Sequence, residues 1–180
     1  MLSFERLSAR AWNLTKRPVL AAFLWVFRKR LGAQDLRFAD ETVDAGYATY
    51  RTLATARVPV TFLFPVQVGR GPVPLITTPH FSFVQAHLKE ESGSWEKESW
   101  RAYTNQASPS SPSTEAKRQQ RFEILIDGIT EDPEQVHILV AINPRLRGFE
   151  IVDGFHRAAI MAVCHPRKKV LCSVVSHIVA

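Results

Sequence analysis

Hydrophobic and polar positions follow their clearest pattern in the C-terminal third of the chain. Aliphatic and β-branched runs predict strands over 136–142, 149–152 and 170–178, and a helix-forming run covers 155–164. The short turn 143–148 between the first two strands favours a hairpin, whereas a helix before the last strand implies a crossover. This order of elements predicts a compact α+β domain with a small mixed sheet flanked by helices.

The pattern is less regular between the N-terminus and this region. Residues 40–56 are typical of a short helix that carries Tyr47 and Tyr50, and the prolines of 58–66 favour an edge strand. A strand end leading into a helix is expected over 75–88, so His80 is either a structural residue at a helix start or a substrate contact.

Two further helices and one loop are expected in the middle of the chain. Trp95, Trp100 and Tyr103 are expected in an amphipathic helix over 91–106, and a second helix is expected over 115–129. Its buried side should carry Phe122, Leu125, Ile126 and Ile129. The segment 107–114 is rich in Ser and Pro, which predicts a mobile loop inserted within the domain.

The first 31 residues have a helical pattern that Pro18 divides, because proline ends or kinks a helix. The second stretch has an apolar face followed by Arg28, Lys29 and Arg30. Its apolar core is shorter than the roughly 20 residues that span a bilayer. Two interpretations are open: a helix docked on the domain or on a second subunit of a homo-oligomer, or a basic amphipathic segment on a membrane surface.

Charge divides the chain into an N-terminal helical arm, 1–37, and a domain, 38–180. The arm has 8 Lys and Arg residues against 2 Asp and Glu, and the domain has 15 of each, so the net charge of +6 belongs to the arm. A DNA-binding domain is therefore not expected. Cys164 and Cys172 have no metal-ligand spacing and are expected to be buried thiols. With no secretory signal evident, we expect a cytoplasmic protein, peripheral at the inner membrane if the arm binds lipid.

The most informative motif is Asp153-Gly154-Phe155-His156-Arg157, where a predicted strand turns sharply into a helix. Such a turn leaves backbone N–H groups at the positive end of the helix macrodipole. The imidazole and the guanidinium in the first helical turn add donors for phosphate. Capping alone would also explain Asp-Gly at a strand-to-helix turn. Two cationic residues at a buried helix start favour an anion site.

These five residues resemble the signature of the ParB/sulfiredoxin superfamily, in the form found in its free-serine kinases. The resemblance covers about 122–178 and implies a ParB/sulfiredoxin-like fold in which this turn holds nucleotide phosphates. Sulfiredoxins have a reactive cysteine where this chain has Phe155, so sulfinic acid repair is not expected. ParB partition proteins continue into a helix-turn-helix domain, for which the 16 residues after the predicted helix are too few.

The kinase form of the resemblance implies transfer of phosphate from ATP or ADP, with Mg²⁺, to a hydroxyl of a small molecule. Gly154, His156 and Arg157 would bind the phosphates, with His156 also in the catalytic set. Asp153 would be the catalytic acid/base or the metal ligand. Such kinases also use a second acidic residue from an earlier segment, and Glu41 and Asp44 are candidates for it by their location in the chain. Two alternatives stay open: a nucleotide-responsive switch module, and a DNA-associated nuclease-like protein.

Overall fold

The computed structural model describes residues 34–45, 48–67, 71–89, 100, 102–104, 112–143, 146 and 148–177, together with Trp25. Within these residues six strands form one mixed sheet in the order β1-β2-β8-β6-β7-β3, and β4 and β5 form a separate pair. The strands of the main sheet are β1 (Gln34–Ala45), β2 (Ala48–Pro59), β3 (Leu63–Phe64), β6 (His137–Ile142), β7 (Phe149–Asp153) and β8 (Lys169–His177). The small pair is β4 (Val66–Gln67) with β5 (Gly71–Pro72).

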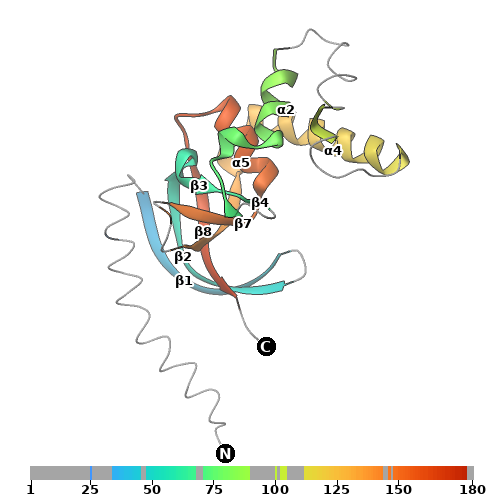
Figure 1. Ribbon diagram of the computed structural model, residues 1–180. Helices are drawn as coiled ribbons and strands as arrows, with labels where there is room; N and C mark the ends of the chain where they lie inside the picture. Colours follow the sequence, from blue (N-terminus) through green and yellow to red (C-terminus); the bar gives the residue numbers. More distant parts are fainter. Residues whose placement is uncertain are drawn as a thin grey trace, which may run out of the picture.

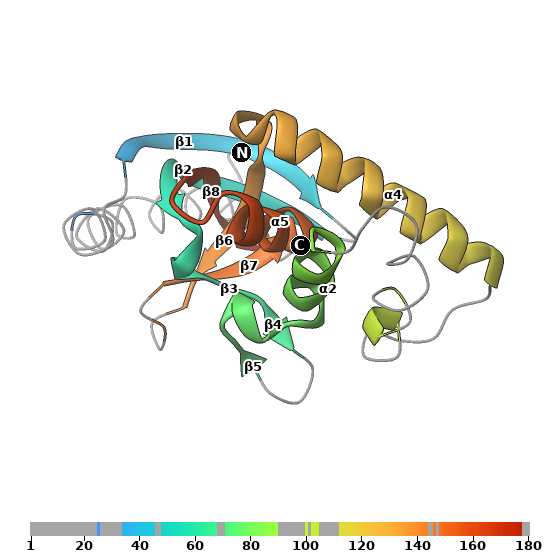
Figure 2. The same ribbon diagram turned by 90° about the horizontal axis from the view of Figure 1, so that it is seen from above.

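The helices lie together beside one part of this sheet (Figure 1). They are α2 (Pro79–His87), α4 (Pro112–Glu131) and α5 (Phe155–Cys164), with short 3-10 helices at Val60–Phe62, Leu75–Thr77 and Pro133–Gln135. Figure 2 shows α5 between α2 and α4. The fold is thus an α+β domain whose mixed sheet packs against several helices, as the sequence predicted.

The C-terminal elements follow the predicted topology. Strands β6 and β7 form an antiparallel hairpin, and α5 then connects β7 to β8, which pairs with β6 in parallel. Strand β8 also pairs with β2 in antiparallel orientation, so it lies inside the sheet. Strand β7 pairs with β3 in parallel, and β3 forms the edge of the sheet. The edge strand expected over 58–66 is thus confirmed only for β3, because Val58 and Pro59 end the internal strand β2 and Val60–Phe62 is a 3-10 helix.

The helix predicted over 40–56 is wrong, because this region forms the antiparallel strands β1 and β2. Ala, Arg and Leu are good helix formers, which explains the helical interpretation. From Thr52 to Val58 of β2, however, every second residue is buried, including Ala54 and Ala56. This period of two places one face of the strand on the core, and tertiary packing overrides the local propensity. Tyr50 lies in β2, and Tyr47 falls outside the described residues.

Several predicted boundaries also change. The segment before α2 is a 3-10 helix, not a strand end, and α4 begins at Pro112, so 112–114 belong to a helix instead of the predicted loop. Strand β1 begins at Gln34, so the last four residues of the predicted arm belong to the sheet. The rest of the arm except Trp25, the loop at 107–111, and the helix at 91–106 except Trp100 and 102–104 lie outside the described residues.

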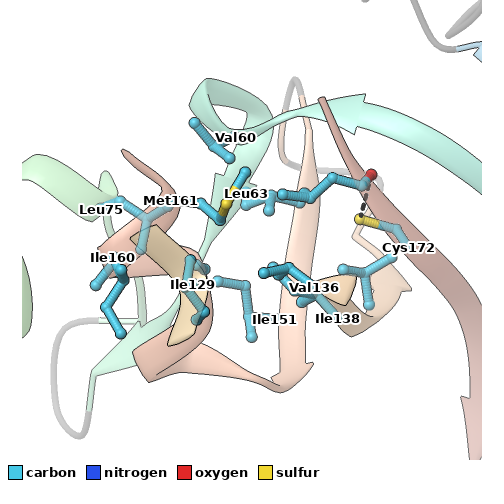
Figure 3. Close-up of a cluster of buried hydrophobic side chains, with 14 of the residues drawn as sticks. Val60, Leu63, Leu75, Ile129, Val136, Ile138, Ile151, Ile160, Met161 and Cys172 are labelled. Carbon is cyan, nitrogen blue, oxygen red and sulfur yellow. Dashed lines mark hydrogen bonds between the residues drawn. The ribbon is translucent and has the colours of Figure 1, made fainter. Parts of the chain in front are cut away.

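Helix α5 is held in place by a buried face of small and apolar residues. Ala158, Ala159, Ile160 and Met161 are fully buried, and the two alanines let neighbouring elements approach closely. Ile160 and Met161 join Val60, Leu63, Leu75, Ile129, Val136, Ile138, Ile151 and Cys172 in the core (Figure 3). Burial of this kind stabilises the fold by about 25 cal/mol per Å² of apolar surface. It fixes the N-terminus of α5 against the end of β7.

The predicted buried side of α4 is confirmed. Phe122, Ile126 and Ile129 are buried, and Leu125 is partly buried against the core. No helix in the described part of the chain is long and apolar enough to cross a membrane.

Candidate functional site

The turn between β7 and α5 has the geometry that the sequence motif predicted. Strand β7 ends at Asp153, and Gly154 adopts the left-handed conformation with φ of 94° and ψ of 24°. The N–H of Ala158 then donates to the carbonyl oxygen of Gly154 at 2.9 Å, which closes the first helical turn. No side-chain hydrogen bond caps the start of α5. The N–H groups before Ala158 therefore point toward a ligand or solvent.

An open pocket of about 410 Å³ lies over this turn. Its lining comprises Leu125, Val152, Asp153, Gly154, Phe155, His156 and Arg157. All four predicted site residues, Asp153, Gly154, His156 and Arg157, thus border one pocket. Its polar groups are one carboxylate, one imidazole, one guanidinium and the backbone of a helix N-terminus, a set suited to an anion and an associated cation.

Arg157 is held at the turn by an ion pair with Asp153, the first residue of the same motif. A guanidinium nitrogen of Arg157 donates to Oδ2 of Asp153 at 2.8 Å, one helical turn away. The side chains are 36% and 50% exposed, respectively, so the ion pair faces solvent and stabilises the fold by at most about 1 kcal/mol. Its main consequence is positional, because it holds the guanidinium beside Gly154.

Gly154 is required both by its backbone angle and by its surroundings. A Cβ atom here would lie 3.3 Å from the Nε atom of Arg157 and 3.4 Å from the Cα of Ile138. A Cβ atom would therefore be tight against the guanidinium, which would have to give by a few tenths of an ångström, and would be in ordinary contact with the β6 backbone. Glycine lets the turn, the arginine and the sheet meet closely.

His156 lies at the border between this pocket and a cluster of aromatic side chains. Its Nε2 is 3.4 Å from the hydroxyl oxygen of Tyr103, and that oxygen is 3.0 Å from Nε2 of His80. The rings of His80 and Phe122 meet the His156 ring edge-on, with centroids 4.5 and 4.9 Å away. With Nε2 turned toward Tyr103, Nδ1 is the ring nitrogen that remains for a ligand in the pocket.

Burial and nearby cations favour neutral imidazoles in this cluster. Burial lowers the pKa of His156, and the charges of Arg118 and Arg157 lower it further, while Asp153 acts in the opposite direction. Burial, together with His156 and Arg118, lowers the pKa of His80 to about 3. A neutral His156 can donate to a phosphate oxygen from one nitrogen while the other faces Tyr103.

The sequence did not identify Tyr103 and Arg118 as neighbours of the site. Burial raises the pKa of the Tyr103 hydroxyl, and the charge and hydrogen bond of Arg118 act against that increase. Arg118 belongs to α4, whereas Arg157 belongs to α5. The charge of Arg118 lowers the pKa of both His80 and His156. His80 is the second residue of α2, after the N-cap Thr78, and its ring packs on Phe155 with centroids 4.0 Å apart. The expected position of His80 at a helix start is therefore confirmed.

The two acids proposed by location do not lie at the turn. Glu41 and Asp44 are exposed residues of β1, at the opposite edge of the sheet from β7 and β3. Asp44 accepts a hydrogen bond from the Thr49 hydroxyl at 2.7 Å within its own hairpin. The second acid of the kinase interpretation is thus not provided by β1.

No group of three or more His, Cys, Asp or Glu side chains that could hold a metal ion occurs among the described residues. Mg²⁺ often binds through one or two carboxylates plus the phosphates of its substrate. Asp153 fits this mode, because half of its side chain is exposed at the pocket. Of the two cysteines, Cys172 is fully buried in β8 and Cys164 is partly buried at the far end of α5 from the turn.

Comparisons of this chain with protein families, with curated proteins and with solved structures found no match.

The buried histidine pair predicts a pH dependence of stability. Lowering the pH from 6.5 to 5 should reduce the free energy of unfolding by about 2 kcal/mol through His80 alone. In this range the unfolded imidazole takes up a proton, whereas the folded one stays neutral until about pH 3. The stabilisation is present above pH 6.5 and is lost as the pH falls toward 3. Urea unfolding at several pH values measures it.

Two variants separate this effect from general destabilisation. His80→Gln should flatten the pH dependence, whereas Phe83→Leu, in the same aromatic cluster, should lower stability at every pH and keep the slope. An unchanged slope in His80→Gln would show that other groups control the acid response.

Proposed function

We propose that this protein binds a nucleotide through the β7–α5 turn and transfers phosphate to a hydroxyl of a small molecule. The proposal includes membership of the ParB/sulfiredoxin superfamily. Its support is the order of strand, turn, helix and strand over 149–177 around Asp-Gly-x-His-Arg. The donor would be ATP or ADP, and Mg²⁺ would be the associated metal.

The observation that carries the proposal is the left-handed Gly154 at the floor of the turn pocket. It aims the N-terminus of α5 into a space that Arg157 and His156 also border. Backbone N–H groups, a guanidinium and a neutral imidazole together form a strong set of donors for phosphate oxygens. Capping of the helix alone would need neither the arginine nor the histidine.

Each residue has a distinct role in the proposed reaction. Arg157 and the α5 backbone bind and orient the phosphates, and His156 donates from Nδ1 to a phosphate oxygen. Asp153 takes the proton of the acceptor hydroxyl as phosphate is transferred, or it holds the metal. A bound Mg²⁺ supplies neutralisation of charge on the phosphates. Tyr103 keeps the His156 ring oriented.

Arg157→Ala should weaken nucleotide binding by about 10- to 100-fold, because charge-assisted hydrogen bonds to the phosphates are lost. Isothermal titration with Mg-ATP and Mg-ADP measures the loss. Arg157→Lys keeps the charge without the planar fork and should give an intermediate affinity. Arg167→Ala removes an exposed charge beyond the C-terminal end of α5 and should bind normally. Normal binding by Arg157→Ala would place the nucleotide site elsewhere.

A nucleotide-responsive switch is the second candidate, and one observation favours it. The acids expected from β1 lie at the far edge of the sheet, so Asp153 is the carboxylate that borders the turn pocket. Incubation with ATP or ADP and a panel of hydroxyl metabolites distinguishes the candidates. Nucleotide consumption that depends on one metabolite supports the kinase, whereas binding without such dependence supports the switch.

A further inference from the structure

A second open pocket, of about 500 Å³, lies directly beside the turn pocket. It is a groove between α4 and the 3-10 helix at Pro133–Gln135, and it shares Leu125 and Arg157 with the turn pocket. A single ligand can therefore lie in both pockets, with Arg157 between its two parts. The size of the groove falls within the 300–1,000 Å³ typical of small-molecule sites.

Gly128 lines this groove without an evident structural reason for being glycine. It lies inside helix α4 and is exposed, and a Cβ atom built on it meets nothing within 4 Å. Its backbone is not left-handed. Glycine inside a helix is destabilising relative to alanine. An open floor at this position suits a flat group that lies against the helix.

The groove is lined by both apolar and polar side chains. Ile124 is 63% exposed and provides most of the apolar surface, since Ile129 and Val136 are nearly buried. The polar lining is Arg121, Glu131, Asp132 and Gln135. The Gln135 amide nitrogen donates to Asp132 at 2.6 Å, so its oxygen and the Glu131 carboxylate are the groups that can accept from hydroxyl groups or the edge of a base. An exposed isoleucine above a bare stretch of helix backbone is a suitable surface for a planar ring.

We infer that this groove binds the nucleoside part of the nucleotide, with the base against Ile124 and Gly128 and the ribose near Arg157. The inference rests on the proposed function, because the phosphates at the turn place the nucleoside within reach of the groove. It assigns α4 to base recognition and the β7–α5 turn to phosphate binding. The two parts of the ligand can therefore be tested separately.

The test compares ATP with tripolyphosphate, which has the phosphates but no nucleoside. Gly128→Leu should reduce the affinity for Mg-ATP about tenfold, to near that of Mg-tripolyphosphate, and should leave tripolyphosphate binding unchanged. Asp127→Leu, which adds the same side chain to the neighbouring exposed position outside the groove, should leave both affinities unchanged. Gly128→Ala should raise the melting temperature by about 2–4 °C even though it reduces ATP affinity.

The possible outcomes separate this inference from the proposed function. If Gly128→Leu binds ATP normally while Arg157→Ala loses both ligands, the groove does not bind the nucleoside and the phosphate site stands. If Gly128→Leu loses both ligands equally, the groove is not specific for the nucleoside and the inference fails. If the unmodified protein binds neither ligand, the proposed function fails and the inference fails with it.

Discussion

Asp153→Asn should reduce phosphate transfer about 10²- to 10⁴-fold while nucleotide affinity changes little, because a positioned base contributes a factor of this size. Asparagine has nearly the same shape and can still accept the hydrogen bond from Arg157, so the turn should keep its geometry. It cannot accept the proton of the acceptor hydroxyl, and it binds a divalent cation more weakly. Single-turnover assays with the acceptor found in the metabolite panel, alongside titration calorimetry, measure the two effects separately.

Asp44→Asn is the matched control, since Asp44 is also exposed and hydrogen-bonded within its own local structure. It lies on β1, away from the turn, and should transfer phosphate at the normal rate. A large loss in Asp44→Asn with a normal rate in Asp153→Asn would reverse the assignment of the catalytic acid.

Gly154→Ala should both destabilise the fold and impair nucleotide binding. A non-glycine residue in the left-handed region costs about 1–3 kcal/mol. The added Cβ would also lie 3.3 Å from the Arg157 guanidinium, which would have to give by a few tenths of an ångström and so change its position beside the turn. Denaturant unfolding should report the first effect, and titration of ATP and tripolyphosphate, under conditions where the variant is folded, should report the second.

Gly71→Ala provides the control for backbone strain. Gly71 also has a positive φ, of 73°, but a Cβ there meets nothing within 4 Å and the residue lies in the small β4–β5 pair. This variant should be destabilised by strain and yet bind nucleotide normally. Equal loss of binding in both variants would mean that destabilisation, not the geometry of the turn, controls affinity.

The region from β6 to β8 was predictable because the residues of each element have a propensity and a hydrophobic pattern that indicate the same secondary structure. The helix predicted over 155–164 has the observed bounds of α5. The predicted ends of the strands before and after it differ from the observed ends by no more than one residue. The left-handed conformation of Gly154 could also have been inferred from the sequence, because glycine adopts this conformation readily and here stands between a strand and a helix. The four motif residues are adjacent in sequence, so one turn brings them together.

The β1–β2 hairpin was not predictable from local propensity. Its residues Thr52, Leu53, Ala54, Thr55 and Ala56 have no strong apolar alternation, because alanine occupies the buried positions where a larger residue would mark a strand. Pairing with β8, which is more than a hundred residues away in sequence, decides the conformation. Contacts of that range leave little trace in a local pattern.

The neighbours of His156 were missed for a similar reason. His80, Tyr103 and His156 come from three helical segments, with separations along the chain of 23 and 53 residues between successive members. Each aromatic or histidine residue alone has an ordinary explanation as a core or capping residue. The aromatic character of 95–103 was a usable signal, but nothing in the sequence marked Arg118, which is one of several cations on α4.

The internal position of β8 has a consequence for biosynthesis. Among the described strands, β2 and β6 are joined through β8, which follows both of them in sequence, so a ribosome makes both outer parts of the sheet before the strand that joins them. Until residues 169–177 emerge, the β1–β2 hairpin and the β6–β7 hairpin each expose an unpaired edge, the kind of surface that promotes aggregation. Completion of the sheet therefore has to wait until β8 is synthesised.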